Sequence, residues 1–286
     1  MTAMKTANCE PTLNDHEVWA FCKKGYHVLE GVVSDEINAR VLEFLDAHEG
    51  LGGQLINEDW FVENVFLNPQ AAGAVRSLLG KDFGLPVGMG NHRVVCPNRS
   101  QGWHHDGAAL VGPELNHLQV FYYPQDCPEE MGPTGLVPGS HFLRALQSWM
   151  SHYGAISKEV KTSAPAGSIF ITAYPIWHRR SKSTAKGIRN MLKYCYWRST
   201  PPQHDWIAEP NFNPMTADFP DATDSPRQQC QSWYEVGEMY YWLRGELDTF
   251  YGIMGGEGWP HGYPVAWKPE GFRRFSKEAA NAPAPR

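Results

Sequence analysis

The chain has 286 residues, enough for one domain with a substantial core, and charged residues make up 20% of it with a formal net charge of −6. This acidic balance argues against a nucleic-acid or anionic-membrane surface. The six cysteines are scattered without a Cys-x-x-Cys spacing, and no long apolar run is present, which predicts reduced thiols, no transmembrane helix and a cytoplasmic protein.

The N-terminal part predicts a strand followed by two helices. Residues 1–15 are expected to form a loose tail, and residues 26–33 have the β-branched and aromatic content of a strand. Ser34 is suited to cap a helix, since Asp35 and Glu36 match the positive end that follows. Apolar residues then recur at helical spacing, and they do so again over residues 68–79.

The middle of the chain has the texture of short strands separated by turn residues. Proline (22) and glycine (27) are plentiful, which favours a strand-rich fold over a helical bundle. The expected strands are residues 93–96, 103–106, 118–123, 135–137, 168–172 and 191–197. This spacing predicts a β-sandwich or jelly roll inside a single domain of residues 1–286.

The C-terminal part predicts a loop and then a helix. Residues 201–228 are rich in proline and aspartate and are expected to be irregular, and residues 279–286 to be disordered. Between them, apolar residues fall at helical spacing at Trp233, Val236, Tyr240, Leu243 and Leu247. We treat residues 199–275 as an extension of the core.

The first chemical pattern is Trp103-His104-His105-Asp106-Gly107. Residues i and i+2 of a strand share a face, so His104 and Asp106 can hold one metal ion together while His105 points away. Two histidines and one carboxylate form the facial triad that binds Fe(II) and leaves positions open for oxygen chemistry. A His-x-Asp pair is weak evidence by itself, and an ordinary surface pair is its alternative.

Further segments follow that pair in a fixed order. They are Gly132-Pro133-Thr134-Gly135-Leu136-Val137-Pro138-Gly139-Ser140-His141, residues 164–172, Trp177-His178 and Lys186-Gly187-Ile188-Arg189. In this order the chain resembles the phytanoyl-CoA dioxygenase family of Fe(II)/2-oxoglutarate oxygenases, and residues 25–36 resemble that family's opening strand and helix. The resemblance covers about residues 21–198 and implies a mainly β double-stranded β-helix (jelly roll, cupin-like) with flanking helices.

The resemblance also implies a site. His178 becomes the third Fe(II) ligand, and 2-oxoglutarate and O2 become the cosubstrates, with succinate as a product. Arg189 is implied as the anchor of the distal carboxylate of 2-oxoglutarate, because a guanidinium pairs with a carboxylate in a bidentate way. Its alternative is a solvent-facing arginine. Ser183 departs from the family, many of whose members carry Asn there, which leaves the neighbouring hydrogen bonds open.

The roles of Gln119, Phe121 and His141 can each be interpreted in two ways. By alternation Gln119 and Phe121 share one face of their strand with Tyr123. If that face is inward, Gln119 binds the cosubstrate and Phe121 packs on it; otherwise both are ordinary core residues. His141 is a rival metal ligand by its type, but it is structural in the family.

The leading hypothesis is an oxygenase that hydroxylates a small molecule. Related halogenases carry a small residue in place of Asp106, so the retained carboxylate favours hydroxylation. Desaturation, cyclisation or dealkylation at the same iron is the alternative within enzymes, and a non-catalytic cupin-like metal-binding protein is the rival class. An acyl-CoA is the family's namesake substrate, but the chain shows no phosphate-binding cluster. We expect residues from about 201 to 267 to roof the substrate pocket.

Overall fold

The largest sheet runs through the middle of the molecule. The computed structural model describes residues 5–107, 109–214, 217 and 226–254, with side chains for 233–253 in the last range. The sheet has seven antiparallel strands in the order β1-β3-β12-β6-β9-β2, with β4 paired to β12. They are β1 (Thr6–Ala7), β2 (Tyr26–Leu29), β3 (Phe83–Gly84), β4 (Met89–Asn91), β6 (His117–Tyr123), β9 (Ser168–Ala173) and β12 (Leu192–Trp197).

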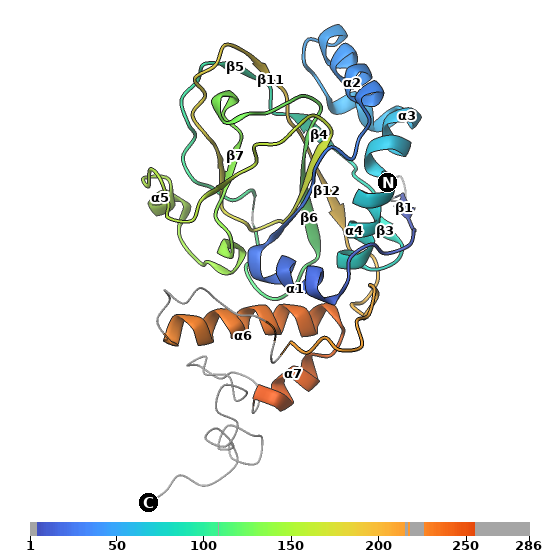
Figure 1. Cartoon of the computed structure of the whole chain (residues 1–286), viewed down its shortest axis with the longest axis vertical. Helices are drawn as coiled ribbons and strands as arrows, with labels where there is room; N and C mark the ends of the chain where they lie inside the picture. The colour runs from blue at the N-terminus through green and yellow to red at the C-terminus, as the bar shows by residue number, and fades with distance from the viewer. Residues whose placement is uncertain (1–4, 108, 215–216, 218–225, 255–286) are drawn as a thin grey trace, which may run out of the picture.

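Two smaller sheets face it from the other side (Figure 1). One has the order β10-β7-β8, and the other pairs β11 with β5. Their strands are β5 (Val94–Cys96), β7 (Thr134–Leu136), β8 (Val160–Lys161), β10 (His178–Arg180) and β11 (Gly187–Arg189). Apolar side chains such as Phe121, Leu136 and Phe170 fill part of the space between the layers.

Helices cover the outer face and the lower end of the main sheet (Figure 1). They are α1 (Asp15–Lys24), α2 (Asp35–Ala47), α3 (Asp59–Phe61), α4 (Pro69–Leu79), α6 (Pro226–Leu243) and α7 (Leu247–Met254). The short α5 (Gln147–Met150) lies apart from them, on the side of β7. Single-turn segments lie at Gly53–Asn57, Val62–Phe66, Glu129–Met131 and Ser140–Phe142. The predicted helices are confirmed: Ser34 caps α2 by accepting from the Ile37 N–H, and Asn68 caps α4. None of the helices in the described ranges is long and apolar enough to span a membrane.

The predicted N-terminal tail is wrong. Thr6–Ala7 pairs with β3, and a helix begins at Asp15. That helix has a capping box: the Asn14 side chain accepts from the Glu17 N–H, and the Glu17 side chain accepts from the Asn14 N–H. The pattern Asn-x-x-Glu before an apolar run is readable in the sequence, so the helix could have been predicted.

The alternation expected for β6 is confirmed. Leu118, Val120 and Tyr122 face the large core beneath the helices. Phe121 and Tyr123 pack between the layers, on the opposite face. β12 alternates in the same way: Leu192, Tyr194 and Tyr196 join the helical core, so the intervening residues face the inner side.

Two other predictions need correction. Residues 103–106 do not form a regular strand; His104 makes a single antiparallel bridge to His178 instead. The expected C-terminal helix is divided, because α6 ends at Leu243 and Leu247 opens α7. Gly245 lies between them with a φ of +71°, a left-handed conformation that glycine adopts without steric cost.

Candidate metal centre

The backbone brings two histidines together. His104 and His178 exchange backbone hydrogen bonds of 3.0 and 2.9 Å, which places their rings 4.5 Å apart. His104 Nδ1 lies 3.0 Å from the Gly102 carbonyl, and His178 Nδ1 lies 3.0 Å from the Ile176 carbonyl. Because a carbonyl can only accept, both Nδ1 atoms carry a proton. Each imidazole therefore presents Nε2 as the atom that can bind a metal.

Asp106 completes the cluster. Its Oδ1 lies 3.9 Å from His104 Nε2 and 3.7 Å from His178 Nε2. One ligand atom from each of the three residues lies within 4.8 Å of the others. The structure thus brings together the three residues that were predicted to bind iron, and this set of nitrogen and carboxylate donors fits a divalent transition metal.

The electrostatics favour the metal-binding protonation states. Burial and the nearby charge of Lys193 lower the pKa of His178 to about 3, so this imidazole is neutral at pH 7. Burial raises the pKa of Asp106, but interactions with His178 and Lys193 outweigh it, and the net result is a lowered pKa. A neutral histidine and an ionised aspartate are ready to bind a cation without releasing protons.

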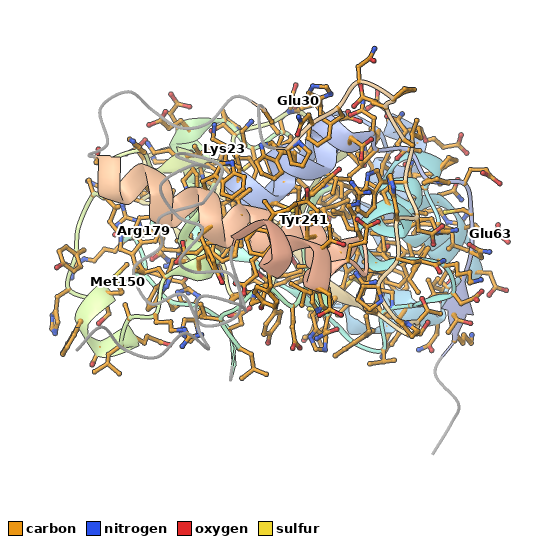
Figure 2. The ribbon with its side chains drawn as sticks, turned by 90° about the horizontal axis from the view of Figure 1, so that it is seen from below. Lys23, Glu30, Glu63, Met150, Arg179 and Tyr241 are labelled. Atoms are coloured by element: carbon orange, nitrogen blue, oxygen red, sulfur yellow. The ribbon has the colours of Figure 1, made fainter. Side chains whose placement is uncertain are left out.

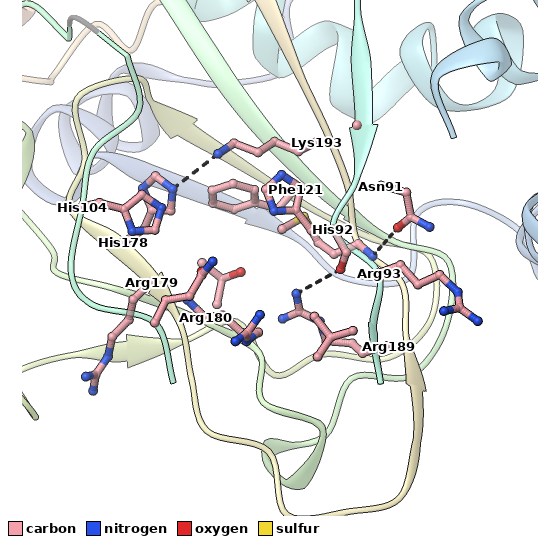
Figure 3. Close-up of a pocket in the computed structure, with 15 residues that line it drawn as sticks. Asn91, His92, Arg93, His104, Phe121, His178, Arg179, Arg180, Arg189 and Lys193 are labelled. Atoms are coloured by element: carbon pink, nitrogen blue, oxygen red, sulfur yellow. Dashed lines mark hydrogen bonds between the residues drawn. The ribbon is translucent and has the colours of Figure 1, made fainter. Parts of the chain in front are cut away.

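A cationic cavity of about 230 Å³ adjoins the two histidines (Figure 3), and we call it the arginine cavity. Phe121 and Thr134 line its wall, and the ring of Phe121 lies 5.6 Å from that of His178. No carboxylate is among the described residues that line it. The cations that line it are Arg93, Arg179, Arg180, Arg189 and Lys193.

Arg189 is the buried cation of this cavity, with 1% of its surface exposed. Its Nη1 donates to the Gly132 carbonyl at 2.7 Å and its Nη2 to the His92 carbonyl at 3.3 Å. Its Nε has no partner, and no carboxylate of the described residues pairs with its charge. An unpaired buried guanidinium is costly, so this arrangement indicates an anionic ligand. The alternative of a solvent-facing arginine is excluded.

Comparison with known proteins identifies the family of the chain. The model of the phytanoyl-CoA dioxygenase (PhyH) family matches residues 7–191. The chain belongs to the phytanoyl-CoA dioxygenase family. Enzymes of this family depend on Fe(II), 2-oxoglutarate and O2, so the protein is an iron- and 2-oxoglutarate-dependent enzyme. No curated protein sequence matches the chain significantly.

Solved structures of the same fold cover about two thirds of the chain. HygX from Streptomyces hygroscopicus, with nickel and 2-oxoglutarate bound, has a TM-score of 0.55 at 14% identity, over 68% of this chain and 90% of HygX. The epimerase SnoN from nogalamycin biosynthesis has a TM-score of 0.52 at 18% identity, over 65% and 83%. The carbocyclase SnoK has a TM-score of 0.50 at 19% identity, over 66% and 87%. These likenesses show the fold, and they confirm the predicted double-stranded β-helix class.

Lys193 was missed by the sequence analysis. It lies on the inner face of β12, pairs with Phe121 on β6, and forms an ion pair with Asp106 Oδ2. Its Nζ is 3.4 Å from His178 Nε2 (Figure 3). Strand alternation could have placed Lys193 opposite the apolar residues of β12. It could not have shown that this face meets Asp106.

Gln119 also contacts the carboxylate of Asp106. Its side chain is fully buried, and its Nε2 donates to Asp106 Oδ2. The inward face was therefore predicted correctly, but Gln119 contacts a candidate metal ligand and does not line the arginine cavity. Phe121 does line it. Contact of either residue with 2-oxoglutarate stays a prediction.

The remaining polar candidates have structural partners. His141 is fully buried and its Nε2 lies 3.0 Å from the Cys22 carbonyl, beneath α1. His105 packs its ring against Trp177, away from the triad as expected. Arg179 pairs with Glu159 at 2.8 Å. Ser183, at the departure from the family pattern, accepts from the Asn98 N–H and so braces a loop.

A larger cavity lies on the other side of Asp106. This large cavity has a volume of about 780 Å³ and is lined by Val87, Leu110, Tyr174 and Trp197 among others. A hollow of about 400 Å³, the connecting hollow, is lined by Asp106, Gln119 and Lys193. It shares Gly88, Tyr174 and Cys195 with the large cavity, and it shares Gly90, His92 and Lys193 with the arginine cavity.

The predicted C-terminal roof needs correction for the part of the segment that the structure describes. Residues 201–214 and α6 pack on α1; α6 lies below α1 in Figure 1 and in front of it in the view from below (Figure 2). No described residue of this segment lines any of the three cavities. The reason is that its aromatic face is already buried against Trp19 of α1, through Trp233 and Tyr240. Residues 215–216, 218–225 and 255–267 of the predicted roof lie outside the described residues.

Proposed function

We propose that the protein is an oxygenase that hydroxylates a small molecule, with His104, Asp106 and His178 as the ligands of Fe(II). The bound iron, with 2-oxoglutarate and O2, supplies the oxidation: one oxygen atom enters the substrate, and the other enters the succinate formed as 2-oxoglutarate loses CO2. The protein contributes two imidazoles that present their Nε2 atoms, of which that of His178 is neutral, and one ionised carboxylate.

The observation that carries the proposal is the unpaired Arg189 in the cavity that reaches the two histidines. A dicarboxylate needs one cation at its distal end, and the buried guanidinium with a free Nε offers one. A metal-binding protein without turnover has no use for such a charge, which would only cost stability. The arginine cavity has room for a small dianion and supplies no competing carboxylate among its described lining residues.

The retained Asp106 supports hydroxylation over halogenation, because a carboxylate occupies the position that a chloride would need. Desaturation, cyclisation and dealkylation remain alternatives, since enzymes of this fold include the epimerase SnoN and the carbocyclase SnoK. Product analysis separates them. Hydroxylation adds one oxygen atom to the substrate, whereas desaturation or ring closure removes two hydrogen atoms.

The test is a screen of small molecules for stimulated succinate release by the full chain with Fe(II), followed by mass spectrometry of the product. Asp106→Ala and His178→Ala are expected to lose metal binding in equilibrium dialysis and to lose succinate release. His105→Ala is the matched control, because His105 neighbours the triad but faces Trp177. Full turnover in Asp106→Ala would disprove the ligand assignment.

A further inference from the structure

The cavities on the two sides of the candidate metal centre differ in chemistry. The arginine cavity is lined by five cationic side chains, whereas the large cavity is lined mostly by apolar ones. Apolar residues that line the large cavity include Val87, Leu110, Val111, Pro113, Pro175 and Trp197.

Two polar residues of the large cavity carry no charge at neutral pH. Burial lowers the pKa of His117 below its ordinary value, so the imidazole is neutral. Burial also raises the pKa of the Cys195 thiol to about 11, so the thiol stays protonated. Both groups can form single hydrogen bonds with a ligand, but neither can neutralise an ion.

The charged side chains at this cavity are opposite in sign and already engaged. Arg144 donates to the Val111 carbonyl at 3.3 Å. Burial raises the pKa of Glu238 on α6, and the nearby charge of Arg144 partly opposes that shift, so the two groups lie close enough to interact. Glu114, also in the lining, accepts from Asn116 at 3.3 Å. The lining thus offers no net charge to an ionic ligand.

Aromatic rings form one wall of the large cavity. The rings of His117 and Trp197 meet edge to face at 4.8 Å, and the ring of Tyr174 lies 6.0 Å from that of His117. Flat ring systems pack well against such a wall. Leu110 and Val87, which also line this cavity, are 88% and 62% exposed, which leaves apolar surface for a ligand to cover.

We infer that the large cavity binds an uncharged, ring-bearing apolar small molecule as the substrate. This inference rests on the proposed function, because it makes the cavity the substrate side of that site. A volume of about 780 Å³ is in the range of cavities that hold drug-sized ligands. The connecting hollow links it to Asp106, so a reacting carbon can face the candidate metal centre. A coenzyme A thioester fits poorly, because its phosphates would meet a lining without net positive charge.

The test uses Nile red, an uncharged multi-ring dye, titrated into the full chain loaded with Ni(II) and 2-oxoglutarate. Leu110→Asp and Val87→Asp place a carboxylate in the large cavity and should weaken dye binding at least tenfold. The matched controls are Leu51→Asp and Val95→Asp, at residues that are 69% and 62% exposed and lie outside the three cavities. These controls should bind the dye as the unmodified protein does.

Equal dye affinity in all four variants would overturn the inference, and so would displacement of the dye by free coenzyme A. The affinity for 2-oxoglutarate, measured in the same samples, reports on the fold and on the other cavity. If the unmodified protein binds the dye in the predicted way but does not bind 2-oxoglutarate, the proposed function fails while the chemistry of the large cavity stands. If it binds 2-oxoglutarate and a coenzyme A thioester alone stimulates succinate release, the substrate class is wrong.

Discussion

The two oxygen atoms of Asp106 have different surroundings. Oδ1 faces the Nε2 atoms of His104 and His178, whereas Oδ2 accepts from Gln119 and Lys193. Two donors on one oxygen hold the carboxylate in a fixed orientation, with the other oxygen directed toward the histidines. Hydrogen bonds of this kind set both the geometry and the basicity of a metal ligand.

Lys193→Met is predicted to shift two affinities in opposite directions. The ammonium group repels a divalent cation at the triad but attracts a dianion in the arginine cavity. Its removal should therefore strengthen binding of Mn(II) alone and weaken binding of 2-oxoglutarate, each by roughly tenfold, or about 1.4 kcal/mol. Isothermal titration checks both values. If Lys193 serves only to orient Asp106, Mn(II) binding will become weaker.

Arg189→Ala is predicted to weaken 2-oxoglutarate binding by roughly ten- to a hundredfold, since a charge-assisted bidentate contact contributes about 1.5–3 kcal/mol. Arg189→Lys should recover part of the affinity, because an ammonium cannot reproduce the guanidinium fork. Arg93→Ala is the control: Arg93 lines the same cavity but is exposed. An unchanged affinity in Arg189→Ala would transfer the role to another cation, with Arg180 next in the cavity.

For single residues, spacing along the chain was enough to predict which of them lie together. His104 and Asp106 are two apart, and Arg189 stands at the family's distance from His178, so a local pattern placed them near one another. Lys193 was not predictable in this way. Its contact with Asp106 depends on how β12 lies against the segment that carries the triad, and no spacing along the chain encodes that distance.

Among the elements, α1 and the C-terminal segment form one unit. Asp15, in the first turn of α1, is 3% exposed and accepts hydrogen bonds from Trp206 and Tyr240, each at 2.7 Å. It also accepts from the Glu209 N–H at 2.6 Å. Burial raises the pKa of Asp15, but these hydrogen bonds together lower it, so the carboxylate is ionised. A single side chain thus ties the first helix to a helix about two hundred residues later.

Asp15→Ala is predicted to destabilise the protein by about 2–4 kcal/mol, because it leaves three donors without their shared acceptor. Urea unfolding followed by tryptophan fluorescence measures the change, and Trp206 lies beside the mutated site. Asp35→Ala is the matched control, since Asp35 holds the same helical position in α2 but is exposed. Equal loss of stability in both variants would mean that the general effect of a first-turn acid explains the result.

The sequence predicted where strands and helices form better than it predicted which surfaces they pack against. The spacing of Val236, Tyr240 and Leu243 predicted an amphipathic helix, and the structure contains it. The same spacing could not tell whether the apolar face covers the large cavity or α1, because either surface is apolar. The roof was the wrong choice for the described residues, and the carboxylate of Asp15 is the feature that decides between them.

For the whole molecule, buried histidines make stability depend on pH. Burial lowers the pKa of His141 from 6.5 to about 4. Between these values the unfolded chain binds the proton and the folded chain does not, so stability falls as the pH drops through this window. One such group contributes at most about 1.4 kcal/mol per pH unit. His178, whose pKa is lowered to about 3, acts in the same direction.

His141→Gln is predicted to flatten this dependence. Its urea midpoint should change less between pH 6.5 and pH 4.5 than that of the unmodified protein, even if the variant is less stable at every pH. His152→Gln, at an exposed histidine, should keep the original slope. Parallel curves for the His141 variant and the unmodified protein would assign the pH dependence to other groups.

The packing of α1 against α6 has a consequence for folding during synthesis of the chain. Trp19 leaves the ribosome before its ring partners, Trp233 and Tyr240, which come more than two hundred residues later in the chain. At a synthesis rate of about 5–20 residues per second, the apolar face of α1 stays exposed for roughly 10–45 s before α6 is made. Nascent chains that stop before α6 therefore expose this face, and they are the species we expect chaperones to bind and aggregates to contain.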